Sequence, residues 1–127
     1  MNVKERLVAA KTLVSKVVFP ETTNHHNTMF AGKIMESMAE VAFITATKFS
    51  RQSFVMASCN RINFSKPISK GKMIELRGEI KQIGRTSLMV DVVVYQEDML
   101  FFGQVMAVNG EFVLVAITDE GKPDMIV

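Results

Sequence analysis

The chain has 127 residues, of which 48% are hydrophobic and 22% are charged, and its formal net charge is +2. This length accommodates one domain with one hydrophobic core, so we expect a single domain over residues 1–127. The basic residues are scattered and their excess is small, which argues against a nucleic acid as partner. No apolar run approaches the roughly 20 residues that cross a bilayer, so we expect no membrane partner either.

The N-terminal residues and the cysteine content predict a cytoplasmic protein. Residues 1–6 contain neither the apolar core nor the small-residue cleavage site of a signal peptide. Cys59 is the single cysteine, which rules out an intrachain disulfide and is typical of a reducing compartment. We expect Cys59, which has no evident partner base, to be a buried structural thiol rather than a nucleophile.

The first half of the chain predicts a strand followed by one long helix. Residues 11–19 alternate loosely between apolar and polar and stop at a proline, as a strand does. After the polar segment 21–28, apolar side chains recur at spacings of three and four over Phe30–Phe49. We expect Asn27 or Thr28 to cap this helix. The expected buried stripe consists of Ala31, Met35, Met38, Ala42, Thr45 and Phe49.

The second half predicts four strands joined by turns. Apolar residues tend to recur at every second position over 55–64, 73–83, 87–95 and 100–117. Asn109–Gly110, inside the last of these segments, indicates a bulge or bend. Strands joined by short connections pair in antiparallel fashion, and a single helix can cover one face of the sheet. The expected fold class is therefore α+β.

Four segments, in order along the chain, resemble the hot-dog acyl-CoA thioesterases. Residues 20–32, PETTNHHNTMFAG, are similar to the opening motif of that family, roughly P-x-x-T-N-x-x-G-T-x-F-G-G. Residues 57–68, 84–87 and 110–116 resemble three further blocks. The resemblance implies the hot-dog fold, an antiparallel sheet wrapped around one long central helix. It also implies hydrolysis of acyl-CoA to a free acid and CoA, with no metal or organic cofactor.

The same resemblance implies an oligomer that binds acyl-CoA between subunits. Family members pair their sheets edge to edge as homodimers and often assemble further as trimers of dimers, which are hexamers. Each dimer then holds two active sites, both formed at the subunit interface. Such pairing would also cover an exposed edge of the sheet.

The segment that starts the helix carries the first candidate catalytic groups. A helix N-terminus offers free backbone N–H groups and a positive dipole end, which suit the oxyanion of a thioester under attack. Gly32 would let the substrate approach this end closely. By resemblance, Asn24 orients the attacking water or the thioester. The alternative is that Asn24 only satisfies the backbone of its own turn.

The second catalytic position of the family is vacant. By resemblance, an aspartate after a helix methionine acts as base or nucleophile from the partner subunit, and that position is Ala39. Glu40 is a candidate substitute, although one residue along a helix rotates a side chain by about 100°, so a solvated or interface carboxylate is the alternative. Because a general base contributes roughly 10²–10⁴ in rate, we expect impaired hydrolysis, or an inactivated variant, or a non-catalytic acyl-CoA-binding module.

Candidate substrate-binding residues follow from the chemistry of CoA. Its phosphates call for arginine or lysine, and the pantetheine arm could bond strand backbone near Ala57 and Ser58. The ten methionines and nine phenylalanines indicate either adaptable core filling or a channel for an acyl chain, which would pass Met35, Met38 and Phe43. The candidates for the nucleotide end are Arg61 and Lys66 and, by resemblance, the turn residues Gly84, Arg85 and Ser87.

His25 and His26 allow two other hypotheses. Adjacent histidines without further ligand spacing predict a metal site only weakly, so we expect no metal and treat either ring as a hydrogen-bond donor beside the thioester. A hot-dog dehydratase acting on acyl thioesters would need a histidine paired with a carboxylate. His25 or His26 with Glu40 is the only such set nearby.

Overall fold

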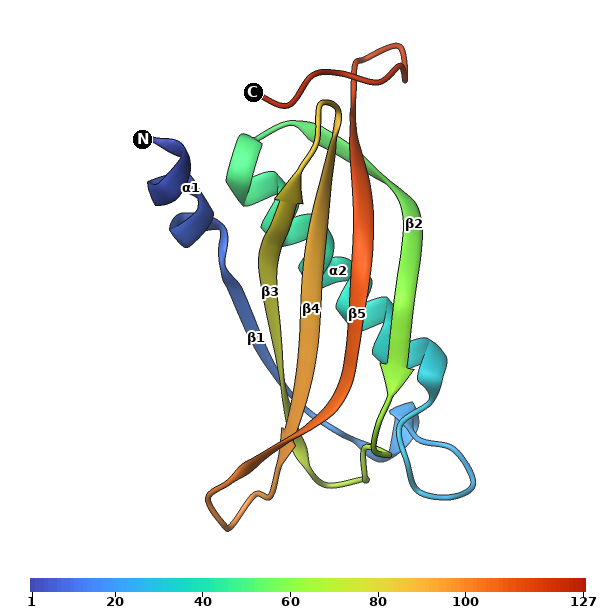
Figure 1. Ribbon diagram of the computed structural model, residues 1–127. Coiled ribbons are helices and arrows are strands. Elements are labelled where there is room, and N and C mark those ends of the chain that lie inside the picture. Colours follow the sequence, from blue (N-terminus) through green and yellow to red (C-terminus); the bar gives the residue numbers. More distant parts are fainter.

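The computed structural model describes residues 1–127, in which one long helix covers one face of a five-stranded sheet (Figure 1). The elements are α1 (Val3–Ala10), β1 (Thr12–Val17), the 3-10 helix η1 (Pro20–Thr22), α2 (Ala31–Ser50), β2 (Ser53–Phe64), β3 (Met73–Ile83), β4 (Ser87–Glu97) and β5 (Gln104–Ile117). The strand order is β1-β3-β4-β5-β2, and every neighbouring pair is antiparallel. The predicted α+β class is therefore confirmed.

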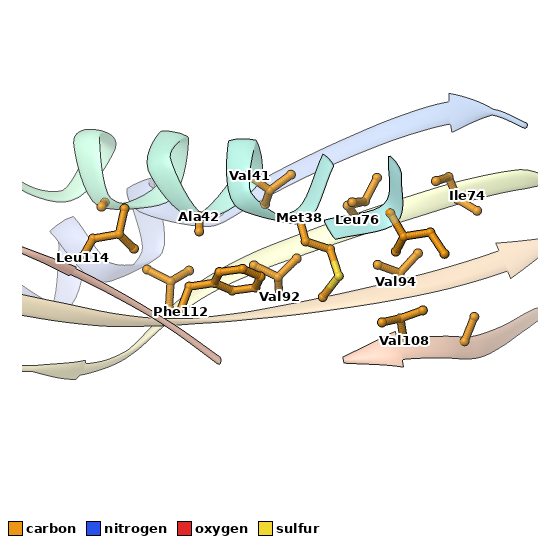
Figure 2. Packing of buried hydrophobic residues seen from close by; sticks show 14 of the residues in the cluster. Met38, Val41, Ala42, Ile74, Leu76, Val92, Val94, Val108, Phe112 and Leu114 are labelled. Atoms are coloured by element: carbon orange, nitrogen blue, oxygen red, sulfur yellow. The ribbon is translucent and has the colours of Figure 1, made fainter. Parts of the chain in front are cut away.

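The core lies between α2 and the face of the sheet that it covers. Figure 2 shows Met38, Val41 and Ala42 of α2 pointing at side chains of β3, β4 and β5. The alternation along β4 is complete, since every second residue from Leu88 to Val94 is buried. This burial fixes which face of each strand points inward, because a shift of one residue would turn the apolar side chains to solvent.

Several details of the predicted elements are wrong. The helix α1 was not expected; Asn2 caps it by accepting the Glu5 N–H at 2.8 Å, and it packs on α2. Neither Asn27 nor Thr28 caps α2, which begins after Phe30 without a side-chain cap. The last strand begins at Gln104 rather than residue 100, because residues 98–103 form an exposed tip between β4 and β5.

The buried stripe of α2 also differs at its start. Ala31 and Met35 are exposed, and Ile34 is buried in their place. Ile34 precedes Met38 and Val41 by four and seven residues and so shares their buried face, whereas Met35 is rotated from Ile34 by about 100°. From Met38 onward the expected positions are buried: these are Met38, Ala42, Thr45 and Phe49.

The predicted bulge at Asn109–Gly110 lies on the neighbouring strand instead. Both residues keep regular partners in β4. In the pairing of β2 with β5, however, the register shifts: Asn60 lies opposite Glu111, and the next paired residue of β2 is Asn63, opposite Asn109. Arg61 and Ile62 therefore face Gly110 alone, so β2 has one extra residue here, and Arg61 adopts the left-handed region at φ 51°. Because β2 is an edge strand, it can bulge without breaking a second ladder.

The strand β3 passes close to α2 at Gly78, which leads to a prediction about stability. A Cβ at this position would overlap Thr45 Oγ1 and lie 2.7 Å from Val41 Cγ1. Thr45 Oγ1 is held by hydrogen bonds to Val41 O at 2.8 Å and to Thr12 Oγ1 at 3.0 Å. We expect Gly78→Ala to lower the free energy of unfolding by about 1–3 kcal/mol, measured by urea denaturation.

Two variants serve as controls for this prediction. Gly32→Ala should not destabilise the fold, because a Cβ at Gly32 meets no atom within 4 Å. Removing the hydroxyl with Thr45→Ala should make Gly78→Ala less costly than it is in the parent chain. An equal loss from Gly78→Ala in both backgrounds would show that the close approach to Thr45 is not the cause.

Candidate active site

The segment before α2 folds into a short two-stranded turn that carries Asn24. The Asn24 N–H donates to Thr28 O at 2.8 Å, and the Phe30 N–H donates to Thr22 O at 2.9 Å. Asn27 closes the turn in the left-handed region at φ 61°, a conformation that asparagine tolerates. Since Asn24 faces Thr28, it lies about three strand residues, or roughly 10 Å, from Ala31, the first residue of α2.

The connection between β2 and β3 holds this turn in place. The Met29 N–H donates to Ile68 O at 2.8 Å, and the Lys70 N–H donates to Asn27 O at 2.9 Å. Met29 and Ile68 are both buried, so the first of these bonds is shielded from water. The turn is thus fixed to the rest of the domain by its backbone rather than by its exposed side chains.

The side chain of Asn24 is fixed on one side only. Its Oδ1 accepts hydrogen bonds from His26 N at 2.9 Å, from Thr28 N at 3.3 Å and from Thr28 Oγ1 at 3.1 Å. Its Nδ2 has no acceptor within the chain. The turn-stabilising role of Asn24 is therefore present, and it leaves the amide N–H groups available to a ligand.

The N-terminus of α2 offers further donors at the same end. The first intrahelical bonds run from Lys33 N and Ile34 N to Phe30 O, so the N–H groups of Ala31 and Gly32 have no acceptor in the chain. Both residues are exposed. Packing does not require a glycine at Gly32, because its Cβ would enter open space. Free N–H groups at the positive end of a helix dipole suit an oxyanion.

Ala39 and Glu40 lie farther along α2 and do not join these donors within one chain. Ala39 is half-buried and packs against the core, whereas Glu40 is exposed and forms no ion pair. Eight residues separate Ala39 from the first residue of α2, which corresponds to about 12 Å along the axis. One chain therefore does not present the Ala39 position to a thioester held at its own helix N-terminus.

The turn with the candidate residues Gly84, Arg85 and Ser87 lies at the opposite end of the domain. It closes the β3–β4 hairpin, with the Gly84 N–H donating to Ser87 O at 2.8 Å. Figure 1 shows this hairpin beside the C-terminal end of α2, whereas the Asn24 turn is at the other end. Since α2 has 20 residues, the two ends are separated by about 30 Å. The structure does not bring these sites together in a single chain.

The other binding candidates are spread along β2 and its exit. Ser58 and Arg61 are exposed on β2, and the Arg61 Nε lies 3.7 Å from Glu111 Oε1. The Lys81 ammonium, and to a smaller extent the Arg61 guanidinium, holds the pKa of Glu111 below its usual range. Lys66 is exposed just after β2, at the same end as Asn24. Of these residues, only Lys66 is near the end with the candidate oxyanion donors.

The environments of Cys59 and Met38 differ from the prediction. Cys59 is exposed on the edge strand β2, not buried, because no further strand covers that edge. The partial burial of Cys59 raises the pKa of its thiol, and this disfavours the nucleophilic thiolate. Met38 is fully buried in the core, so the expected acyl channel along Met38 is filled within this chain.

The two histidines lie on the exposed part of the Asn24 turn. The ring centroids of His25 and His26 are 3.9 Å apart. No group of three or more His, Cys, Asp or Glu side chains is arranged to hold a metal ion. No helix of the structure has the length and apolarity needed to cross a membrane.

Comparisons with known proteins place the chain in a family. A family model described as "Thioesterase superfamily" matches residues 26–101. An acyl-CoA thioester hydrolase of Bacillus subtilis is 32% identical over 114 residues, which cover 90% of this chain and 66% of that protein. The structure of an acyl-CoA hydrolase from Staphylococcus aureus, in complex with butyryl-CoA, CoA and CoA disulfide, superposes with a TM-score of 0.90. It is 33% identical, over 94% of this chain and 73% of that one.

The chain belongs to the thioesterase superfamily, and its architecture is the hot-dog fold. A hexameric acyl-CoA thioesterase superposes with a TM-score of 0.91 at 30% identity, covering 94% of this chain and 77% of that one. The chain spans slightly less than two thirds of the first curated relatives, with 66% of the Bacillus subtilis protein and 64% of one from Helicobacter pylori.

Proposed function

We propose that this chain acts on acyl-CoA as a thioesterase, releasing a free carboxylic acid and CoA without a metal or organic cofactor. The observation that carries the proposal is the uncapped N-terminus of α2 beside the fixed amide of Asn24. These groups provide several N–H donors that have no acceptor in the chain, all at the same end of the domain. A relative solved with butyryl-CoA and CoA supports this substrate class.

The spacing of two residues in a relative supports the assignment of Ala39. In the acyl-CoA hydrolase of Staphylococcus aureus, one studied variant replaces an asparagine and another replaces an aspartate 15 positions later. Asn24 and Ala39 have the same separation. We therefore infer that Asn24 matches the asparagine and that Ala39 occupies the position of the carboxylate.

The exposed edge of β2 supports a homodimer with shared sites. This strand has 12 residues and pairs on one side only, with β5. If two β2 edges pair in antiparallel fashion, the two-fold axis reverses the ends of the partner. The partner's 84–87 turn then lies at the end of the assembly that carries Asn24. Hexameric relatives support a further assembly of three such dimers.

The proposed reaction follows from the donors in place. The N–H groups of Ala31, Gly32 and Asn24 Nδ2 stabilise the charge that develops on the thioester oxygen as water attacks the carbonyl carbon. The carbon–sulfur bond then breaks, and the CoA thiolate takes up a proton. The partner subunit's Ala39 cannot accept the proton from water, so bulk solvent or the partner's Glu40 takes it. Arg85 of the partner subunit would bind the phosphates of CoA.

The experiment that tests this function is an assay of thiol release from acyl-CoAs of increasing chain length. Hydrolysis that is lost in Asn24→Ala would support the proposal. CoA binding without any thiol release, even after a carboxylate is restored at Ala39, would instead identify an acyl-CoA-binding module, which the vacant position favours. Hydration of an enoyl-CoA without thiol release would overturn the thioesterase in favour of a dehydratase. We propose that the protein acts in the cytoplasm.

A further inference from the structure

Two of the three hydrogen bonds that hold the Asn24 side chain come from Thr28. The hydroxyl Oγ1 of Thr28 donates to Asn24 Oδ1 at 3.1 Å, and the Thr28 N–H approaches the same oxygen at 3.3 Å. The third donor is the His26 N–H at 2.9 Å. Thr28 contributes the only side-chain contact among them, and it is half-buried in the turn.

These bonds determine which end of the Asn24 amide is free. Backbone N–H groups can only donate, so His26 N and Thr28 N require the oxygen of the amide to face them. A flipped amide would place its NH₂ group against two donors and leave all three groups unsatisfied. The oxygen is therefore held inside the turn, and Nδ2 is the end presented to a ligand.

We propose that Thr28 is a positioning residue for the thioesterase reaction, whose hydroxyl holds the Asn24 amide so that Nδ2 donates to the thioester. This inference rests on the proposed function. The hydroxyl is the specific part of the contact, because the fold of the turn depends on backbone bonds. Those bonds are Asn24 N to Thr28 O, Met29 N to Ile68 O, and Lys70 N to Asn27 O. Replacing the hydroxyl by a methyl group should leave them intact.

The test compares Thr28→Val with Thr28→Ser. Valine keeps the shape of threonine and removes the hydroxyl, whereas serine keeps the hydroxyl. We expect Thr28→Val to lower kcat roughly five- to tenfold, the equivalent of one lost hydrogen bond, with KM changed by less than about twofold. Thr28→Ser should restore most of kcat. The assays are run on the chain as it stands and on Ala39→Asp, which provides the carboxylate.

The matched control is Thr22→Val. Thr22 is in the same segment, and its hydroxyl donates to Phe19 O at 2.9 Å instead of to Asn24. The same chemical change there should leave kcat unchanged. A comparable fall in kcat for Thr22→Val and Thr28→Val would show a general disturbance of the segment and would overturn the positioning role.

A second readout does not depend on catalysis. In ¹⁵N-labelled protein, the side-chain amide signals of Asn24, assigned through their loss in Asn24→Ala, should be sharp in the parent chain and in Thr28→Ser. They should broaden or shift in Thr28→Val, because the amide loses its only side-chain partner. Unchanged amide signals together with an unchanged kcat would overturn the proposal. If no variant hydrolyses any acyl-CoA but the amide signals respond as expected, the proposed function fails while the positioning of Asn24 stands.

Discussion

Ala39→Asp should raise kcat for acyl-CoA hydrolysis by about 10²–10⁴-fold, the contribution of a positioned general base or nucleophile. The side chain at this position is half-buried on α2, at the same separation from Asn24 as the aspartate studied in a relative. The donors for the thioester oxygen are already present, so restoring the carboxylate supplies the missing partner. The measurement is thiol release at saturating acyl-CoA, with the parent chain assayed at high protein concentration.

Two variants separate the effect of the charge from that of the added volume. Ala39→Asn has nearly the shape of aspartate and cannot act as a base, so it should remain as slow as the parent chain. Glu40→Gln tests whether the exposed neighbouring carboxylate serves in the chain as it stands. If the parent chain already turns over fast, Ala39→Asp adds nothing and Glu40→Gln abolishes activity, then Glu40 is the base and the assignment of Ala39 is wrong.

The parts of the fold that could be predicted from the sequence are those with a clear apolar period. The strand β3 was expected at 73–83 and lies at Met73–Ile83, because its alternating pattern is buried on one face and solvated on the other. The helix α2 was expected within one residue at each end. The apolar period did not predict α1. This eight-residue helix has few buried side chains and is stabilised by its contact with α2 rather than by an apolar stripe of its own.

The candidate site was predictable in its local part only. Asn24 and Gly32 could be found because the turn and the helix start are adjacent in sequence. The hydroxyl of Thr28 was missed: the bond from His26 N to Asn24 Oδ1 is a local pattern typical of asparagine, but the additional bond from the Thr28 hydroxyl has no sequence signal of its own. The relation of Arg85 to Asn24 could not be read from one chain, because the two residues lie at opposite ends of the domain.

Mixed oligomers should show that Asn24 and Arg85 act in one site from two subunits. We expect Asn24→Ala to lower the rate by roughly 10²–10³-fold, the loss of one oxyanion donor. We expect Arg85→Ala to raise KM, because the CoA phosphates lose a charge-assisted partner. Both variants are made in the Ala39→Asp background, where the rates are measurable.

When the two variants are coexpressed, half of the dimers contain one subunit of each kind. One of their two sites then combines an intact Asn24 with an intact Arg85, so activity at low substrate should recover to about a quarter of the Ala39→Asp level. The chain that carries both substitutions, coexpressed with unmodified Ala39→Asp subunits, provides the control. Its mixed dimers contain one defect in each site, so activity should be about a quarter of the Ala39→Asp level, from the unmodified dimers alone, whereas residues that act from the same chain would give about a half. Recovery can arise only if each site takes these residues from different subunits. If the mixture is no more active than its two components, both residues act from the same chain or Arg85 takes no part, and the antiparallel pairing of β2 edges loses its functional support.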